Sequence, residues 1–342
     1  MINSVQRQHL GRWSHAISVL FILVTGWIAI RFLMELRGFR KPPSVYLVLA
    51  STRKDNYTWA TNLSVPNMHV IPYVADDQNA SFHPPANKGN EAMMYLTYLY
   101  DFYDYLPDIS IFTHASESGW HNDAIFDMKI SHAIEHLDLE EVRRRKYVNL
   151  KIGHMNGCPA WINTTISFGS PGYNPLKLEE PYVKTTFEEN FGGQEVPEIF
   201  ASPCCSQFAV AKDAIRRNPR AQYKEHVQRL LRQTLDDHIS GRVWEHLWQY
   251  IFLGKAVECP NEHKTLCSQY HICFQSSADF ESWNFVERQR TGELTEQETG
   301  GVTQTPDNLT SGHLKTMLDF VRNEAMERGK SKLLRDKIAS DL

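Results

Sequence analysis

The sequence predicts an α/β protein in which helices flank a mostly parallel sheet, preceded by one N-terminal transmembrane helix. Residues 44–51 and 108–114 are apolar runs of strand length, and an amphipathic helical pattern lies between them at 92–106. A strand, a helix and a second strand at this spacing are typical of βαβ units. Near the N-terminus, residues 16–30 contain no charged side chain.

The composition indicates a folded protein with no nucleic-acid partner. The 342 residues include 36 basic and 40 acidic side chains, a net charge of −4, so no basic field covers the domain. Hydrophobic residues make up 42% and aromatic residues 11%, which is typical of a globular protein.

Residues 16–34 are predicted to be a signal anchor that crosses a membrane once, because the segment is close to the roughly 20 residues that span a bilayer. A cleaved signal peptide is the alternative, but no small-x-small site follows the apolar run. The predicted organisation is a cytoplasmic tail at 1–15, a stem at 35–43, a main domain at 44–290, and a polar linker with a C-terminal helix at 291–342.

Two features favour a lumenal domain, although more basic residues follow the anchor than precede it. The first is a set of acceptor sequons for N-glycosylation, at Asn56, Asn62, Asn79, Asn163 and Asn308. The second is an even number of cysteines, six, whose spacing lacks the C-x2-C pairs of a zinc site and therefore favours disulfides, with the pairing left open. We expect a single-pass type II glycoprotein of the Golgi or endoplasmic reticulum.

The remaining elements follow from apolar periodicity and from proline and glycine. A second strand at 67–74 is predicted at a sheet edge because Pro72 cannot donate a ladder hydrogen bond. Pro107 is expected to end the helix at 92–106. Further strands are expected at 147–152 and 208–211, long loops at 153–200, and helices at 220–239, 241–253 and 314–342.

Ligands of open α/β sheets bind beyond the carboxyl ends of the strands. The first strand ends at Ser51, with Arg53 close behind, and a later strand ends at His114, so these residues are expected at the binding edge. Residues 87–90 open a helix with a glycine-containing turn, whose free N–H groups suit a diphosphate. The predicted nucleotide-binding residues are therefore Ser51, Arg53, Lys88, Gly89, Asn90 and Glu91; ordinary helix capping is the alternative for the turn.

His114, His121 and Asp123 are candidate ligands for a divalent metal ion, because imidazole and carboxylate groups bind several such ions. A solvated polar loop is the alternative for these three. The acidic pair Asp76–Asp77 is a second candidate for a hard cation such as Mn²⁺ or Mg²⁺.

The apolar pattern at 241–253 carries a polar stripe of Arg242, Glu245 and Gln249. A carboxylate on a buried helix needs a partner or a chemical role. Glu245 is therefore either the ion-pair partner of Arg242 or a general base whose burial raises its proton affinity.

Several strings, in order, carry a family resemblance over most of residues 44–275: NKGNEAMMYLTYLYDFYDYLPDISIFTHA, GCP, PCCSQFAVAKDAI and GRVWEHLWQYIFLGKAVECP. They resemble the fungal domain-of-unknown-function 3431 family, which is remotely similar to glycosyltransferases of the Rossmann-related GT-A fold. The resemblance implies a donor half at Lys88–Glu91, a metal position at His114, an acceptor side at Gln207 and Arg242, and a base at Glu245. Where those enzymes have D-x-D, this chain has Thr113-His114-Ala115.

The expected function is transfer of a sugar from a nucleotide-sugar to an unidentified acceptor, with a divalent metal (Mn²⁺ or Mg²⁺) as the cofactor. Two alternatives stay open. One is a metal-dependent hydrolase or oxygenase that uses His114, His121 and Asp123. The other is a non-catalytic membrane protein that binds glycans or acts as a scaffold.

Overall fold

The computed structural model describes residues 21–31, 42–291 and 311–340. Pro43–Arg335 form one compact unit, and the terminal stretches group separately from it. Of the predicted anchor at 16–34, residues 21–31 are described and are helical, whereas 16–20 and 32–34 lie outside the described residues. Among the helices of the described ranges, none combines the length and the apolar character needed to span a bilayer.

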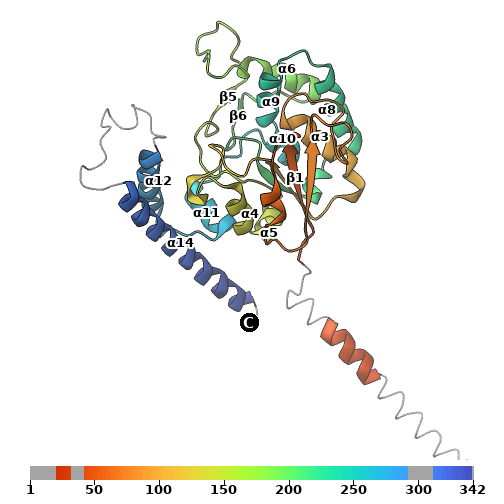
Figure 1. Cartoon of the computed structure of the whole chain (residues 1–342). Coiled ribbons are helices and arrows are strands. Elements are labelled where there is room, and N and C mark those ends of the chain that lie inside the picture. The colour runs from red at the N-terminus through yellow and green to blue at the C-terminus, as the bar shows by residue number, and fades with distance from the viewer. Residues whose placement is uncertain (1–20, 32–41, 292–310, 341–342) are drawn as a thin grey trace, which may run out of the picture. The chain divides into compact units, whose positions relative to one another are not determined.

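The main sheet has five strands in the order β2-β1-β3-β7-β4. Figure 1 labels β1, which lies between β2 and β3. Their bounds are β1 Val45–Ser51, β2 Met68–Val74, β3 Ile109–His114, β4 Tyr147–Asn149 and β7 Phe208–Ala211. β1 pairs in parallel with β2 and β3, whereas β7 is antiparallel to both β3 and β4. Four strands thus share one direction, which confirms the predicted mostly parallel sheet, and β2 lies at the edge, as Pro72 predicted.

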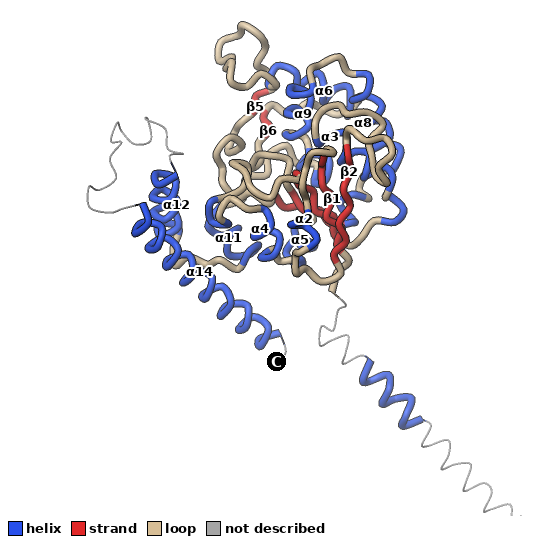
Figure 2. Tube along the Cα trace, viewed as in Figure 1, coloured by secondary structure: helices blue, strands red, loops and turns tan. Residues whose placement is uncertain are grey.

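Alternate residues of the central strands enter two separate cores because both faces of the sheet are covered (Figure 2). Val48, Phe112 and Phe208 pack on one face. The helices of that face are α3 Glu91–Asp101, α6 Glu180–Asn190, α7 Lys212–Ile215, α8 Arg220–Arg232, α9 Asp237–Glu245 and α10 Trp248–Leu253.

Leu47, Ile111 and Ala209 pack on the other face. Its helices are α2 Thr58–Thr61, α4 Ile130–His136, α5 Leu139–Arg145, α11 Glu262–Tyr270, α12 Ser277–Thr291 and α14 Ser311–Ser340. The predicted C-terminal helix therefore packs on the domain: Arg328 Nε of α14 donates to the Cys273 carbonyl at 2.9 Å.

Three helix boundaries differ from the sequence prediction. α3 ends at Asp101, and a 3₁₀ turn at Tyr103–Tyr105 follows; between them the Phe102 ring stacks on the Tyr98 ring, with centroids 4.9 Å apart. The helix predicted at 220–239 ends at Arg232. A new helix, α9, starts at Asp237, where the Asp236 side chain caps it by accepting from the His238 amide.

The helix predicted at 241–253 is in fact the end of α9 and the separate α10. The break places Glu245 at the last position of α9. The fourth strand is shorter than predicted, and the loops at 153–200 contain α6 and the small ladder of β5 Ile162–Asn163 with β6 Ile199–Phe200.

All six cysteines are paired in three disulfides, as the even count predicted: Cys158–Cys259, Cys204–Cys205 and Cys267–Cys273. The first joins residues 101 positions apart and the last joins residues 6 apart. A cross-link restricts the unfolded chain more when it closes a longer loop. Cys158–Cys259 should therefore contribute most to stability.

Replacing both cysteines of Cys158–Cys259 with serine should lower the free energy of unfolding by about 4–5 kcal/mol on the chain-entropy account. The matched Cys267→Ser/Cys273→Ser variant should lose about 2 kcal/mol. Urea unfolding of both variants measures the difference, and equal losses would contradict this ranking.

Candidate active site

The polar residues that follow β3 meet the residues that precede β7. In the antiparallel ladder Phe112 lies opposite Phe208, so the end of β3 is next to the start of β7. The buried Gln207 joins the two segments. Its Oε1 accepts from Thr113 Oγ1 at 2.6 Å, and its Nε2 donates to Asn122 Oδ1 at 2.8 Å. Gln207, which was predicted on the acceptor side, therefore joins the two segments through buried hydrogen bonds.

A cavity of about 510 Å³ opens at this edge of the sheet. Three parts of the chain that the sequence analysis singled out line it: Asn90 and Glu91 at the start of α3, His114 at the end of β3 with His121 in the following loop, and Arg242 and Glu245 of α9. Trp120 and Trp161 add aromatic surface. Residues predicted to bind the donor, to bind a metal ion and to act as the base therefore line one cavity.

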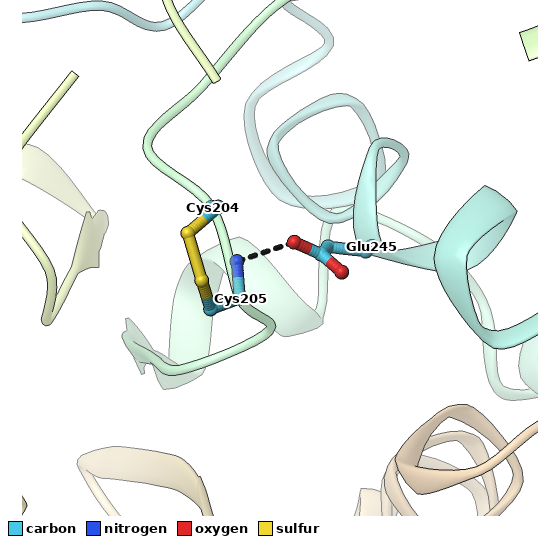
Figure 3. Close-up of side chains that lie close together, drawn as sticks. All are labelled: Cys204, Cys205 and Glu245. Carbon is cyan, nitrogen blue, oxygen red and sulfur yellow. Dashed lines mark hydrogen bonds between the residues drawn. A yellow bond between two sulfur atoms is a disulfide. The ribbon is translucent and has the colours of Figure 1, made fainter. Parts of the chain in front are cut away.

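Glu245 is held by the backbone of a disulfide-linked turn. The amide of Cys205 donates to Glu245 Oε1 at 2.5 Å, and Figure 3 shows the other carboxylate oxygen directed away from that amide. Arg242 does not supply the partner considered for Glu245, because its guanidinium pairs with Glu179 at 3.3 Å. One oxygen of Glu245 is therefore oriented by an amide.

Glu179 is a member of the site that the sequence analysis missed. Its buried Oε1 is 3.3 Å from both Arg242 Nη2 and His246 Nε2. Burial by itself raises the pKa of Glu179, but the His246 hydrogen bond, a backbone amide and the Arg242 charge together bring it below its usual value. Glu179 lies two residues before Pro181 at the start of α6, and this sequence context does not predict a buried carboxylate.

Glu91 lies in a different electrostatic environment. Burial raises the pKa of the Glu91 carboxyl, and the nearby charge of Glu245 raises it further, against opposing effects of His114 and of a hydrogen bond from Ser206. The two carboxyl groups of the cavity are therefore close enough to interact, and Glu91 binds its proton more tightly than an ordinary glutamate.

The two histidines are neighbours, with ring centroids 4.7 Å apart. His114 Nε2 lies 3.1 Å from the Cys205 carbonyl, which can only accept, so this nitrogen carries the proton. Burial, together with the charges of His114 and Lys151, lowers the pKa of His121 to about 4. His121 is therefore neutral at pH 7, and its buried Nε2 has no hydrogen-bond partner among the residues that the structure describes.

Asp123 does not join the histidines. Its carboxylate accepts from the amides of Ile152 and Gly153, at 2.6 and 3.2 Å. Across the described ranges the ligand atoms of His114, His121 and Asp123 do not converge, so they do not fit a shared metal ion. The group that does converge is Cys204, Cys205 and Glu245, within 4.8 Å, and its sulfurs are joined in a disulfide (Figure 3).

The predicted nucleotide-binding residues separate into two groups. Asn90 and Glu91 line the cavity, whereas Lys88 and Gly89 interact with Asp237: the Gly89 amide donates to its Oδ1 at 3.0 Å, and Lys88 Nζ is 3.8 Å away. A diphosphate at this turn would have to displace that carboxylate.

The other two predicted nucleotide-binding residues, Ser51 and Arg53, interact with β2 and with the loop that follows it. Ser51 Oγ donates to the Tyr73 carbonyl at 3.0 Å, and Arg53 binds Asp76 through its backbone amide at 2.8 Å. Neither lines the cavity.

Fold and cavity together define an α/β protein with a cleft at the carboxyl end of its parallel strands, lined by two carboxyl groups and four imidazoles. Residues 47–268 match the family described as Protein of unknown function (DUF3431), and the chain belongs to this family. No curated protein and no solved structure matches the chain.

Glu91→Gln should alter the pH dependence of stability. Because the pKa of Glu91 is raised in the folded state, wild-type stability from this group is present below the unfolded value of 4.5 and is lost as the pH rises through the folded value. The amide does not titrate. The variant should therefore gain stability relative to wild type between pH 4 and pH 8 in urea unfolding.

The control is Met94→Leu, a change of similar volume on the same helix that alters no titratable group. Its stability difference from wild type should stay constant over that pH range. A constant difference for Glu91→Gln as well would show that the Glu91 carboxyl is not perturbed.

Proposed function

We propose that this protein is a glycosyltransferase with a GT-A-like lumenal domain, and that the cavity binds a nucleotide-sugar and the hydroxyl group of an acceptor. In this reaction the acceptor oxygen bonds to the anomeric carbon, the bond to the nucleoside diphosphate breaks, and a base takes the acceptor proton. Glu245 is the base.

The observation that carries the proposal is the pair of carboxyl groups in one cavity with unequal environments. A site that moves protons needs one group that holds a proton and another that accepts one. Glu91 retains its proton more tightly than usual. Glu245 has one oxygen fixed by the Cys205 amide, and its second oxygen is available to an acceptor hydroxyl.

The remaining walls suit a carbohydrate. Trp120, whose residue surface is 67% exposed, stands at the cavity with Trp161, and indole faces pack well on the apolar faces of sugar rings. The amides of Asn90, Asn156 and Asn174 offer both donors and acceptors to hydroxyl groups. Arg242 also lines the cavity and brings a cation suited to an anionic leaving group.

Glu245→Gln should lower turnover by a factor of about 10²–10⁴ while donor binding is retained, because the amide can still accept the Cys205 hydrogen bond but cannot take a proton. The measurements are the melting temperature, donor affinity and turnover on one preparation. Glu189→Gln makes the same chemical change at an exposed position of α6 and should leave all three unchanged.

A panel of nucleotide-sugars identifies the donor first, since a ligand at about 100 times its Kd adds about 2.7 kcal/mol of stability. Wild-type turnover in Glu245→Gln would remove Glu245 from the mechanism. Binding of free glycans without turnover of any nucleotide-sugar would instead favour the non-catalytic alternative.

The disulfides and sequons support a lumenal location behind a type II anchor at 16–34. All six cysteines are paired, which suits an oxidising compartment. The asparagines at 56, 62 and 79 are exposed and that at 163 is half-buried, whereas Asn308 lies outside the described residues. Asn56 Oδ1 also accepts from the Thr58 hydroxyl at 2.9 Å, so the sequon forms a local turn.

Endoglycosidase treatment of cell extracts should increase the gel mobility of the protein, and Asn56→Gln should remove one increment of that shift. Protease added outside intact microsomes should leave the main domain intact. An unglycosylated protein that is fully digested in that assay would reverse the orientation.

A further inference from the structure

The turn at Cys204–Ser206, which leads into β7, has an unusual backbone. Cys205 and Ser206 have φ values of 91° and 50°, in the left-handed region that side chains other than glycine rarely adopt. Such conformations persist only where the surroundings impose them. Here a disulfide joins Cys204 to its direct neighbour Cys205, and both side chains line the cavity.

This one turn contacts three titratable groups of the cavity, Glu245, His114 and Glu91. The Cys205 amide donates to Glu245 Oε1 at 2.5 Å, and the Cys205 carbonyl accepts from His114 Nε2 at 3.1 Å. Ser206 Oγ accepts from the Trp248 indole at 3.2 Å and bonds to the Glu91 carboxyl. The same turn thus holds Glu245 and His114 through its backbone and Glu91 through the Ser206 side chain.

We propose that the disulfide-linked turn Cys204–Ser206 positions Glu91, His114 and Glu245 for reaction and contributes little to the stability of the fold. The inference deepens the proposed glycosyl transfer and rests on it for its kinetic test. Cys204, Cys205 and Ser206 are positioning residues, because they act through the groups that they hold.

Loop length argues against a role in global stability. The Cys204–Cys205 bond closes a loop with a sequence separation of 1, so it restricts the unfolded chain far less than Cys158–Cys259 does with a separation of 101. The bond does restrict the folded turn, because without it residues 205 and 206 are free to leave positive φ. That rotation would move the Cys205 amide and carbonyl together, so Glu245 and His114 would lose their partners in one step.

The test is the Cys204→Ser/Cys205→Ser variant of the full chain, with Cys267→Ser/Cys273→Ser as the matched control at another short-range disulfide. The cleft variant should fold, keep its donor affinity within a few-fold, and lose about 10²-fold in kcat, because a displacement of about 1 Å in a reacting group costs that much. The control should keep wild-type kcat. A cleft variant that fails to fold, or one with wild-type kcat, overturns the proposal.

Hydrogen–deuterium exchange gives a readout that does not need turnover. The amide of residue 205 should exchange faster in the cleft variant, because it no longer donates to Glu245, while β1 and β3 keep their protection. If wild type turns over no nucleotide-sugar, the proposed function fails and this exchange result alone decides the positioning inference. Unchanged exchange at residue 205 would refute it.

Ser206→Ala tests the Glu91 arm with the disulfide intact. It removes the hydroxyl that bonds Glu91 and accepts from Trp248, so kcat should fall about tenfold, as expected for one lost hydrogen bond to a carboxyl group. The hydrogen bond lowers the pKa of Glu91, so its loss should move the alkaline limb of the pH–rate profile upward. The titratable groups that face Glu91 are His114 of β3, Glu245 of α9 and Tyr95, which lies on α3 together with Glu91. An unchanged kcat and pH–rate profile would exclude Ser206 from positioning.

Discussion

The antiparallel pairing of β7 with β3 is the constraint on which the site depends. If β7 ran parallel to β3, the start of β7 and the end of β3 would lie at opposite ends of the strands. The antiparallel ladder places Phe112 opposite Phe208. It therefore brings the turn before β7 to the carboxyl end of the parallel strands, where His114 ends β3. The helix α9 follows later in the chain and carries Glu245 to the same place.

Two buried polar side chains, Gln207 and Glu179, stabilise this junction through specific partners. Gln207 is fully buried and uses both ends of its amide, towards Thr113 and Asn122. Glu179 is fully buried against Arg242 and His246. An unpaired buried polar group costs free energy, so these contacts select one arrangement of the loops around the cavity.

Local patterns were enough to predict most of the fold. Apolar runs and Pro72 gave the strands and the edge position of β2, and their spacing gave the parallel pairs. The direction of β7 could not be predicted, because a four-residue apolar run carries no sign of its orientation. The boundary between α8 and α9 depends on the Asp236 cap, which an unbroken amphipathic pattern conceals.

Only part of the candidate site was predicted, because local sequence patterns do not show which distant segments come into contact. Glu91, His114, Arg242 and Glu245 line one cavity. The first two were singled out from their positions at a helix start and a strand end, and the last two from the polar stripe of an apolar helix. Their partners come from distant segments: Glu179 for Arg242, Asp237 for Gly89, and the Ile152 and Gly153 amides for Asp123. The spacing of residues along a chain does not encode such long-range choices.

The strand order also has a consequence for synthesis on the ribosome. β4 emerges early but pairs within the sheet with β7 alone, so Tyr147–Asn149 must wait without a partner while the chain is extended to Ala211. Translation at about 5–20 residues per second makes that wait several seconds. During it the nascent domain has an open sheet edge that a chaperone can cover. The step that pairs β7 with β3 also delivers the turn before β7 to the end of β3, and the cleft is complete only after α9 has followed with Arg242 and Glu245.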